Sequence, residues 1–128
     1  MRVLLDTHAF LWWMSDDSQL STAARAIISD PENTIFVSVV SVWEIIIKQG
    51  TGKLILSEPA EDYVPDRIRS NQFSTLSVEM RHILRIASLP ALHRDPFDRL
   101  LIAQSECENL AIISVDHLIQ QYSITVIW

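Results

Sequence analysis

Short apolar runs alternate along the chain with longer segments whose apolar residues recur at helical spacing. Residues 3–5 and 111–114 are short and almost entirely apolar, as expected for central strands buried on both faces. This alternation predicts a three-layer α/β fold, in which helices cover both faces of a central, mostly parallel sheet. The expected strands are 3–5, 34–38, 73–77, 111–114 and 124–128, the last at an edge of the sheet; the expected helices are 9–14, 21–28, 39–49, 57–69, 78–87 and 96–109, with a break at Pro65.

The composition fits one compact domain over residues 1–128. The chain is 48% hydrophobic, which is enough for a core that needs no disulfide staples. Cys107 is the only cysteine, so a cysteine-rich zinc site is excluded, and we expect it to pack within its helix. No apolar run approaches the ~18 residues of a membrane span, and the apolar start is too short for a signal peptide. We therefore expect a soluble cytoplasmic protein with no membrane partner.

The segment from His93 to Gln104 combines charged residues with the start of a buried helix. Asp95 is a favourable N-cap, Pro96 suits the first helical turn, and Asp98 favours the positive end of the helix dipole. These local roles account for each acid singly. They do not explain why other parts of the chain also have an acid where a predicted strand or helix begins or ends.

Three further acids follow or interrupt apolar runs: Asp6 after residues 3–5, Asp116 after 111–114, and Glu44 within a very apolar helix. Parallel strands end at the same edge of a sheet, so these carboxylates are expected to converge with the Asp95 and Asp98 region. Glu44 also has a local interpretation, because it could form a capping box with Ser41 and an ion pair with Lys48.

Clustered, partly buried carboxylates require a cation, since their mutual repulsion and desolvation would otherwise keep them protonated. Oxygen ligands favour Mg²⁺ or Mn²⁺. Zinc is disfavoured, because the four histidines lack the close spacing of a zinc motif. Hard metal ions held by acids can activate a water molecule and stabilise charge on a phosphodiester, which is nuclease chemistry.

The charge distribution limits how a polyanion could bind. The net charge is -6, so nucleic-acid binding needs local positive charge rather than a basic surface. Arg81, Arg85, Arg94 and Arg99 form one candidate phosphate-facing patch, although arginines on helices usually face solvent. The segment 50–53, Gly-Thr-Gly-Lys, is not a phosphate-binding P-loop, because it follows a helix and Leu54 stands where the motif requires Ser or Thr.

Four segments in order resemble the successive motifs of PIN-domain ribonucleases, especially the VapC-like toxins of type II toxin–antitoxin systems. They are Leu4-Leu5-Asp6-Thr7-His8, Val42-Trp43-Glu44-Ile45, the segment from His93 to Gln104, and Ser114-Val115-Asp116. The likeness spans nearly the whole chain. It implies a PIN-like fold, Mg²⁺ or Mn²⁺ as cofactor, RNA as substrate, and an acidic metal site formed by Asp6, Glu44, Asp98 and Asp116.

The resemblance also implies roles for neighbouring residues. The third acid of the family usually begins a helix with the pattern Asp-x-x-Ile-Ala, which Asp98 fits with one extra residue, so Asp95 is an auxiliary or alternative ligand. Thr7 is expected to steady Asp6 or a metal-bound water, and Ser114 stands where the family often has Thr. The family further implies a cognate antitoxin and a homodimer. Trp12, Trp13 and the apolar Glu44 helix independently offer more hydrophobic surface than a small core needs.

Other functions fit parts of the pattern. The chain could be an interaction module whose acids only cap helices. It could be a phosphatase or phosphoacceptor domain with Asp6 as nucleophile, although His8 stands where that motif requires a second Asp. It could also cleave RNA without metal, with histidines as acid and base.

Overall fold

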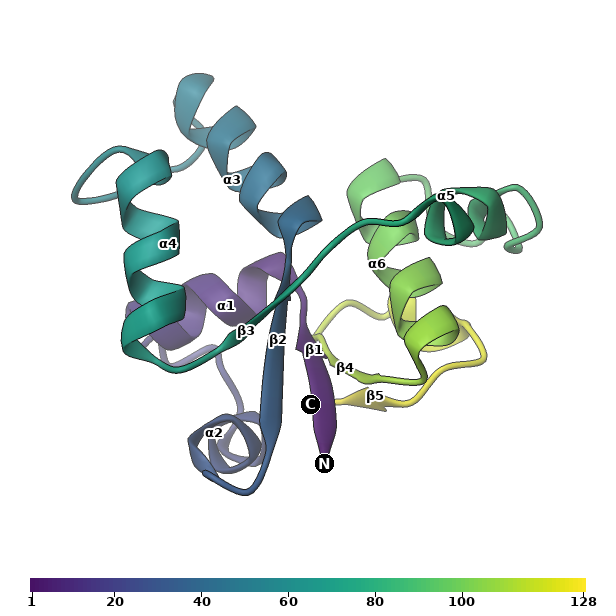
Figure 1. Cartoon of the computed structure of the whole chain (residues 1–128), viewed down its shortest axis with the longest axis horizontal. Coiled ribbons are helices and arrows are strands. Elements are labelled where there is room, and N and C mark those ends of the chain that lie inside the picture. The colour runs from purple at the N-terminus through teal and green to yellow at the C-terminus, as the bar shows by residue number, and fades with distance from the viewer.

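The computed structural model describes all 128 residues and contains one five-stranded sheet with helices on both faces (Figure 1). The strand order is β3-β2-β1-β4-β5, and every neighbouring pair is parallel. The predicted three-layer α/β fold is therefore confirmed, with β5 at an edge. The elements are β1 (Arg2–Leu5), α1 (Thr7–Met14), α2 (Thr22–Ser29), β2 (Thr34–Ser38), α3 (Val39–Gly50), α4 (Ala60–Ser70), β3 (Ser74–Leu76), α5 (Met80–Ile86), α6 (Pro96–Glu108), β4 (Ala111–Ile113), the 3₁₀ turn η1 (Ile119–Gln121) and β5 (Val126–Ile127).

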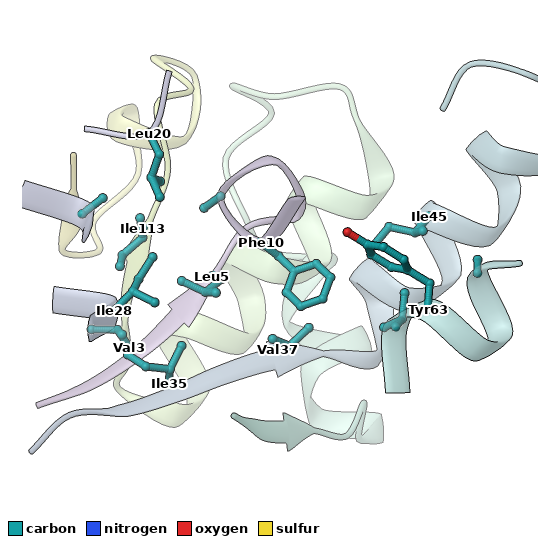
Figure 2. Close-up of a cluster of buried hydrophobic side chains, with 14 residues drawn as sticks. Val3, Leu5, Phe10, Leu20, Ile28, Ile35, Val37, Ile45, Tyr63 and Ile113 are labelled. Atoms are coloured by element: carbon teal, nitrogen blue, oxygen red, sulfur yellow. The ribbon is translucent and has the colours of Figure 1, made fainter. Parts of the chain in front are cut away.

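Along the central strands, the side chains of alternate residues pack into two separate hydrophobic cores, one on each face of the sheet. Val3 and Leu5 of β1 pack with residues of α1, α2, α3 and α4, as Figure 2 shows around Phe10. Leu4, between them, faces the opposite side and packs with α6 and η1. Because both faces are covered, the central strands are apolar throughout rather than alternating with polar residues.

The sheet gathers the residues that follow its strands at one edge. Leu5 of β1 pairs with Val37 of β2 and with Ile113 of β4, so Asp6, Ser38 and Ser114 occupy the next position along three adjacent strands, where those strands end. The chain runs outward from β1 through β2 to β3 and then returns to the other side of β1 as β4. Ligand sites in parallel sheets form beyond the carboxyl ends of the strands, next to such a reversal of strand order.

Local sequence sets most helix boundaries. The Asp95 carboxylate accepts hydrogen bonds from the backbone N–H groups of Phe97 and Asp98, at 2.8 and 3.2 Å, so its predicted capping of α6 is confirmed. Asn109 ends α6 in the left-handed conformation. Gly52, which has a φ of 75°, follows the end of α3, consistent with a turn in place of a P-loop.

Two local predictions were wrong. Helix α3 begins directly after β2, so its N-cap is Ser38 and not Ser41, and the Ser41–Glu44 capping box does not form. Pro65 lies within an unbroken α4. A proline removes only one helical N–H, and the burial of Tyr63 and Val64 holds this helix against the core in spite of that loss. No helix has both the length and the apolar character needed to cross a membrane.

Candidate active site

Asp6 lies at the end of β1 and caps α1. Its Oδ1 accepts the Ala9 N–H at 2.8 Å, and the residue is 4% exposed. Burial raises the pKa of Asp6; hydrogen bonds with Ser114 and Ala9 act in the opposite direction without cancelling it, and the nearby charge of Asp116 raises the pKa further. The charge of His8 also lowers the pKa, but burial still leaves the ionised form of Asp6 destabilised.

Glu44 projects from α3 and is also buried. Its Oε1 lies 2.6 Å from the Thr7 hydroxyl, and its Oε2 lies 2.6 Å from the Lys48 ammonium. Thr7 Oγ1 is also 2.9 Å from Ser41 Oγ. Because a carboxylate only accepts, Thr7 donates to Glu44 and accepts from Ser41. Thr7 therefore orients Glu44, whereas the sequence had led us to expect that it steadies Asp6 or a metal-bound water.

Asp98 and Asp116 meet at His93, a residue that the sequence did not single out for the site. His93 Nε2 is 3.1 Å from Asp98 Oδ2 and 2.8 Å from Asp116 Oδ2. The Asp95 backbone N–H donates to His93 Nδ1 at 3.1 Å, so that nitrogen carries no proton and Nε2 is the donor. The three side chains place one ligand atom each within 4.8 Å of one another.

The pKa values show that the four acids act on one another. Burial raises the pKa of Asp98 to about 7, with further increases from Asp95, Glu44 and Asp6, while His93 lowers it. Partial burial also raises the pKa of Asp116, but hydrogen bonds from His93 and from the Leu118 N–H outweigh this effect and leave the pKa below its ordinary value. Asp98 thus lies in the field of Asp95 from its own segment and of acids from two other segments.

The predicted acids are brought together, but not as one hydrogen-bonded cluster. Asp98 and Asp116 share His93, Glu44 is held by Thr7 and Lys48, and Asp6 is held by the start of α1. Ser114 joins two of the segments, since its Oγ accepts the Asp116 N–H at 3.1 Å and its hydroxyl lowers the pKa of Asp6. Asp95 caps α6 and is not part of the His93 group.

The donor set fits a hard divalent cation. Four carboxylates could supply oxygen ligands, and three of them accept hydrogen bonds from Lys48 or His93, of which Lys48 alone is a cation in this arrangement. A bound ion would supply the positive charge that the raised pKa of Asp98 shows to be deficient. These acidic groups could therefore hold a divalent metal ion.

The predicted arginine patch does not form. Arg81 pairs with Glu79 and Glu108, and Arg85 pairs with Glu106. Arg99 donates to the backbone carbonyls of Ile86 and Pro90, at 3.1 and 3.0 Å. These arginines join α5 and the following loop to α6, and Arg94 alone of the four is exposed without such a role.

Most of the chain matches a known family. Residues 3–124 fit the family model described as PIN domain. The chain belongs to the PIN domain family. A 58-residue segment of this chain is 48% identical to "Ribonuclease VapC16" of Mycobacterium tuberculosis. That segment covers 45% of this chain and 41% of the relative, so it spans less than half of either protein.

Solved PIN-like structures share the fold over nearly the whole chain. The crystal structure of VapBC2 from Rickettsia felis, bound to a DNA fragment from its promoter, matches with a TM-score of 0.71 at 12% identity, over 99% of this chain and 98% of that one. VapBC-1 from nontypeable Haemophilus influenzae matches with a TM-score of 0.65 at 15% identity, over 99% and 97%. At these identities, the similarity establishes the fold.

Proposed function

We propose that this PIN domain is a metal-dependent endoribonuclease. The observation that carries the proposal is the convergence of Asp6, Glu44, Asp98 and Asp116 beyond the carboxyl ends of β1 and β4, where the pKa of Asp98 is raised to about 7 by burial and by its acidic neighbours. A segment 48% identical to a protein named as a ribonuclease supports RNA as the substrate.

Each acid has a role as a ligand of Mg²⁺ or Mn²⁺. When bound, the ion supplies Lewis acidity, which makes a water molecule nucleophilic near neutral pH and stabilises charge on the phosphodiester. Thr7 and Ser114 orient Glu44 and Asp6 for this purpose. Asp95 remains auxiliary, since its carboxylate caps α6. Residues 1–128 would act as one domain, in the cytoplasm.

We further propose that the protein is the toxin of a toxin–antitoxin pair and forms a homodimer. Three of the solved structures that match it are titled VapBC2, VapBC-1 and a toxin–antitoxin complex. On its own surface, α3 exposes Trp43, Ile46 and Ile47 by 58%, 45% and 39%. Contiguous apolar side chains of this kind are typical of protein interfaces.

The geometry disfavours the alternative with Asp6 as a covalent nucleophile. Asp6 is 4% exposed, and one of its oxygens is held by the Ala9 N–H. A phosphoacceptor carboxylate must instead approach the phosphorus atom directly. The interaction-module alternative predicts a folded protein without nuclease activity.

Cleavage of single-stranded RNA by the purified protein tests the proposal. We expect cleavage that requires Mg²⁺ or Mn²⁺ and falls at least about 100-fold in Asp98→Asn, because mutation of a catalytic group has effects of this order. Asp62→Asn, an exposed acid in the first turn of α4, is the matched control and should retain wild-type activity. A folded, metal-loaded wild type that cleaves no RNA would favour the interaction module.

A further inference from the structure

A cleft of about 590 Å³ opens next to Glu44, between α1, the end of α3, the segment 53–57 and α4. Thr7 and Lys48 line this cleft, and both also contact the Glu44 carboxylate. The cleft is therefore separated from Glu44 of the proposed metal site only by these two side chains. We name it the lysine cleft, because Lys48 and Lys53, which line it, are the only two lysines of the chain.

Positive charge in the lysine cleft contrasts with the rest of the molecule. The chain has a net charge of -6, and most of its arginines are paired with acids or bound to backbone carbonyls. Lys53 is exposed and forms no ion pair. One acid, Asp17, also lines the cleft, but its carboxylate accepts the Gln19 N–H at 2.9 Å. Because Lys48 is paired with Glu44, the unpaired cation of the cleft is the ammonium group of Lys53, and Asp17 is the one acid of the lining that forms no ion pair.

The remaining wall of the lysine cleft is apolar and aromatic. Leu11, Trp12, Leu54, Leu56 and Tyr63 contribute to it. The exposed His8 ring lies 5.4 Å from the Trp12 ring, one turn away on α1. Flat aromatic faces beside a cation are the features with which proteins bind single-stranded nucleic acids, since bases stack and phosphates pair with lysine.

From this combination, we infer that the lysine cleft binds one nucleotide of the RNA beside the cleaved bond, with its base against His8 and Trp12 and its phosphate at Lys53. The inference rests on the proposed ribonuclease function. A nucleotide accounts for both properties of the cleft, because it carries a permanent anion and an aromatic ring. An apolar protein segment would use only the apolar wall.

The first test is a titration of the ¹⁵N-labelled protein in EDTA, followed by NMR, so that no cleavage is needed. Adenosine 5′-monophosphate should shift the signals of Thr7, Lys53, Leu54 and the Trp12 indole, whereas inorganic phosphate should shift only Lys53 and its neighbours. Lys53→Gln should weaken nucleotide binding about 3- to 10-fold. Arg69→Gln, which removes an exposed cation at the end of α4, should leave it unchanged.

The second test separates this inference from the proposed function. In the cleavage assay, Lys53→Gln should raise the KM for RNA about 3- to 10-fold with kcat within about twofold of wild type, and Lys53→Arg should restore the KM. A wild type that cleaves RNA, with equal KM in Lys53→Gln and Arg69→Gln and no nucleotide-induced shifts in the cleft, would overturn the inference while leaving the nuclease intact. Shifts caused by an acidic peptide with apolar residues, but not by the nucleotide, would also overturn it and would assign the cleft to a protein partner.

Discussion

The Lys48 ammonium lies 2.6 Å from Glu44 Oε2, one turn earlier in α3, and neutralises a carboxylate that is almost fully buried. The Lys48 side chain is 34% exposed, so the pair lies at the boundary between the core and the lysine cleft. A metal ion bound by Glu44 would supply the same positive charge. Lys48 and the ion therefore have overlapping electrostatic roles.

We predict that Lys48→Gln lowers the free energy of unfolding by about 1 kcal/mol in EDTA, because it leaves Glu44 without its cation. With saturating Mn²⁺, the loss should become smaller, since the ion replaces the missing charge. Urea unfolding with and without Mn²⁺ measures both values. Lys53→Gln, which removes a lysine without a partner, is the control and should change stability little. An equal loss for Lys48→Gln under both conditions would show that the ion does not reach Glu44.

The raised pKa of Asp98 predicts that the stability of the metal-free protein depends on pH in an unusual direction. The pKa of Asp98 is about 7 in the folded protein and near its ordinary value of 3.8 in the unfolded chain, so the folded state binds more protons between these values. The contribution of Asp98 to stability therefore falls as the pH rises from about 4 to 7.

Asp98→Asn should remove this dependence and make the metal-free protein more stable than wild type at pH 8, by about 1–3 kcal/mol, with little gain at pH 4. Groups that do not interact with Asp98 affect both proteins alike, so the difference between the two unfolding curves reports Asp98 together with the acids that interact with it. A difference that stays constant with pH would contradict the raised pKa.

His93 is predicted to align Asp98 and Asp116. His93→Ala should cost about 1–3 kcal/mol of stability, since it removes the N–H donor shared by two carboxylates. It should also weaken the apparent affinity for Mn²⁺ in the cleavage assay by about 10- to 100-fold, as expected for a residue that orients metal ligands. His93→Gln can place an amide N–H near the position of Nε2 and should recover part of the affinity. Loss of stability with unchanged Mn²⁺ dependence would leave His93 a purely structural role.

The sequence predicted the parts of this molecule that depend on local pattern. Apolar runs such as residues 3–5 identify buried strands, and parallel pairing then requires Asp6 and Ser114 to meet at one edge. Asp95 was predicted as the cap of α6 because the Asp-Pro pair fixes the backbone there.

The errors arose where the outcome depends on distant residues. Ser38 and Ser41 both fit a cap, and the end of β2 within the sheet decides between them. The ring of His93 is oriented by the nearby Asp95 N–H, but its partner Asp116 is 23 positions away. Arg85 and Arg99 were not assigned to internal contacts, because their partners are set by the packing of α5 and the next loop on α6.

The most direct test of the four-acid nuclease site is the chemistry of the RNA ends after cleavage in H₂¹⁸O with Mg²⁺ or Mn²⁺. Attack of an activated water on phosphorus breaks the bond to the 3′ oxygen, so mass spectrometry should find a 3′-hydroxyl and a 5′-phosphate that carries one solvent ¹⁸O. Asp6→Asn and Asp98→Asn should yield neither product, and the exposed-acid control Asp62→Asn should yield both. A 2′,3′-cyclic phosphate, or cleavage that persists in EDTA, would contradict the account, because both indicate attack by the RNA's own 2′-hydroxyl without metal.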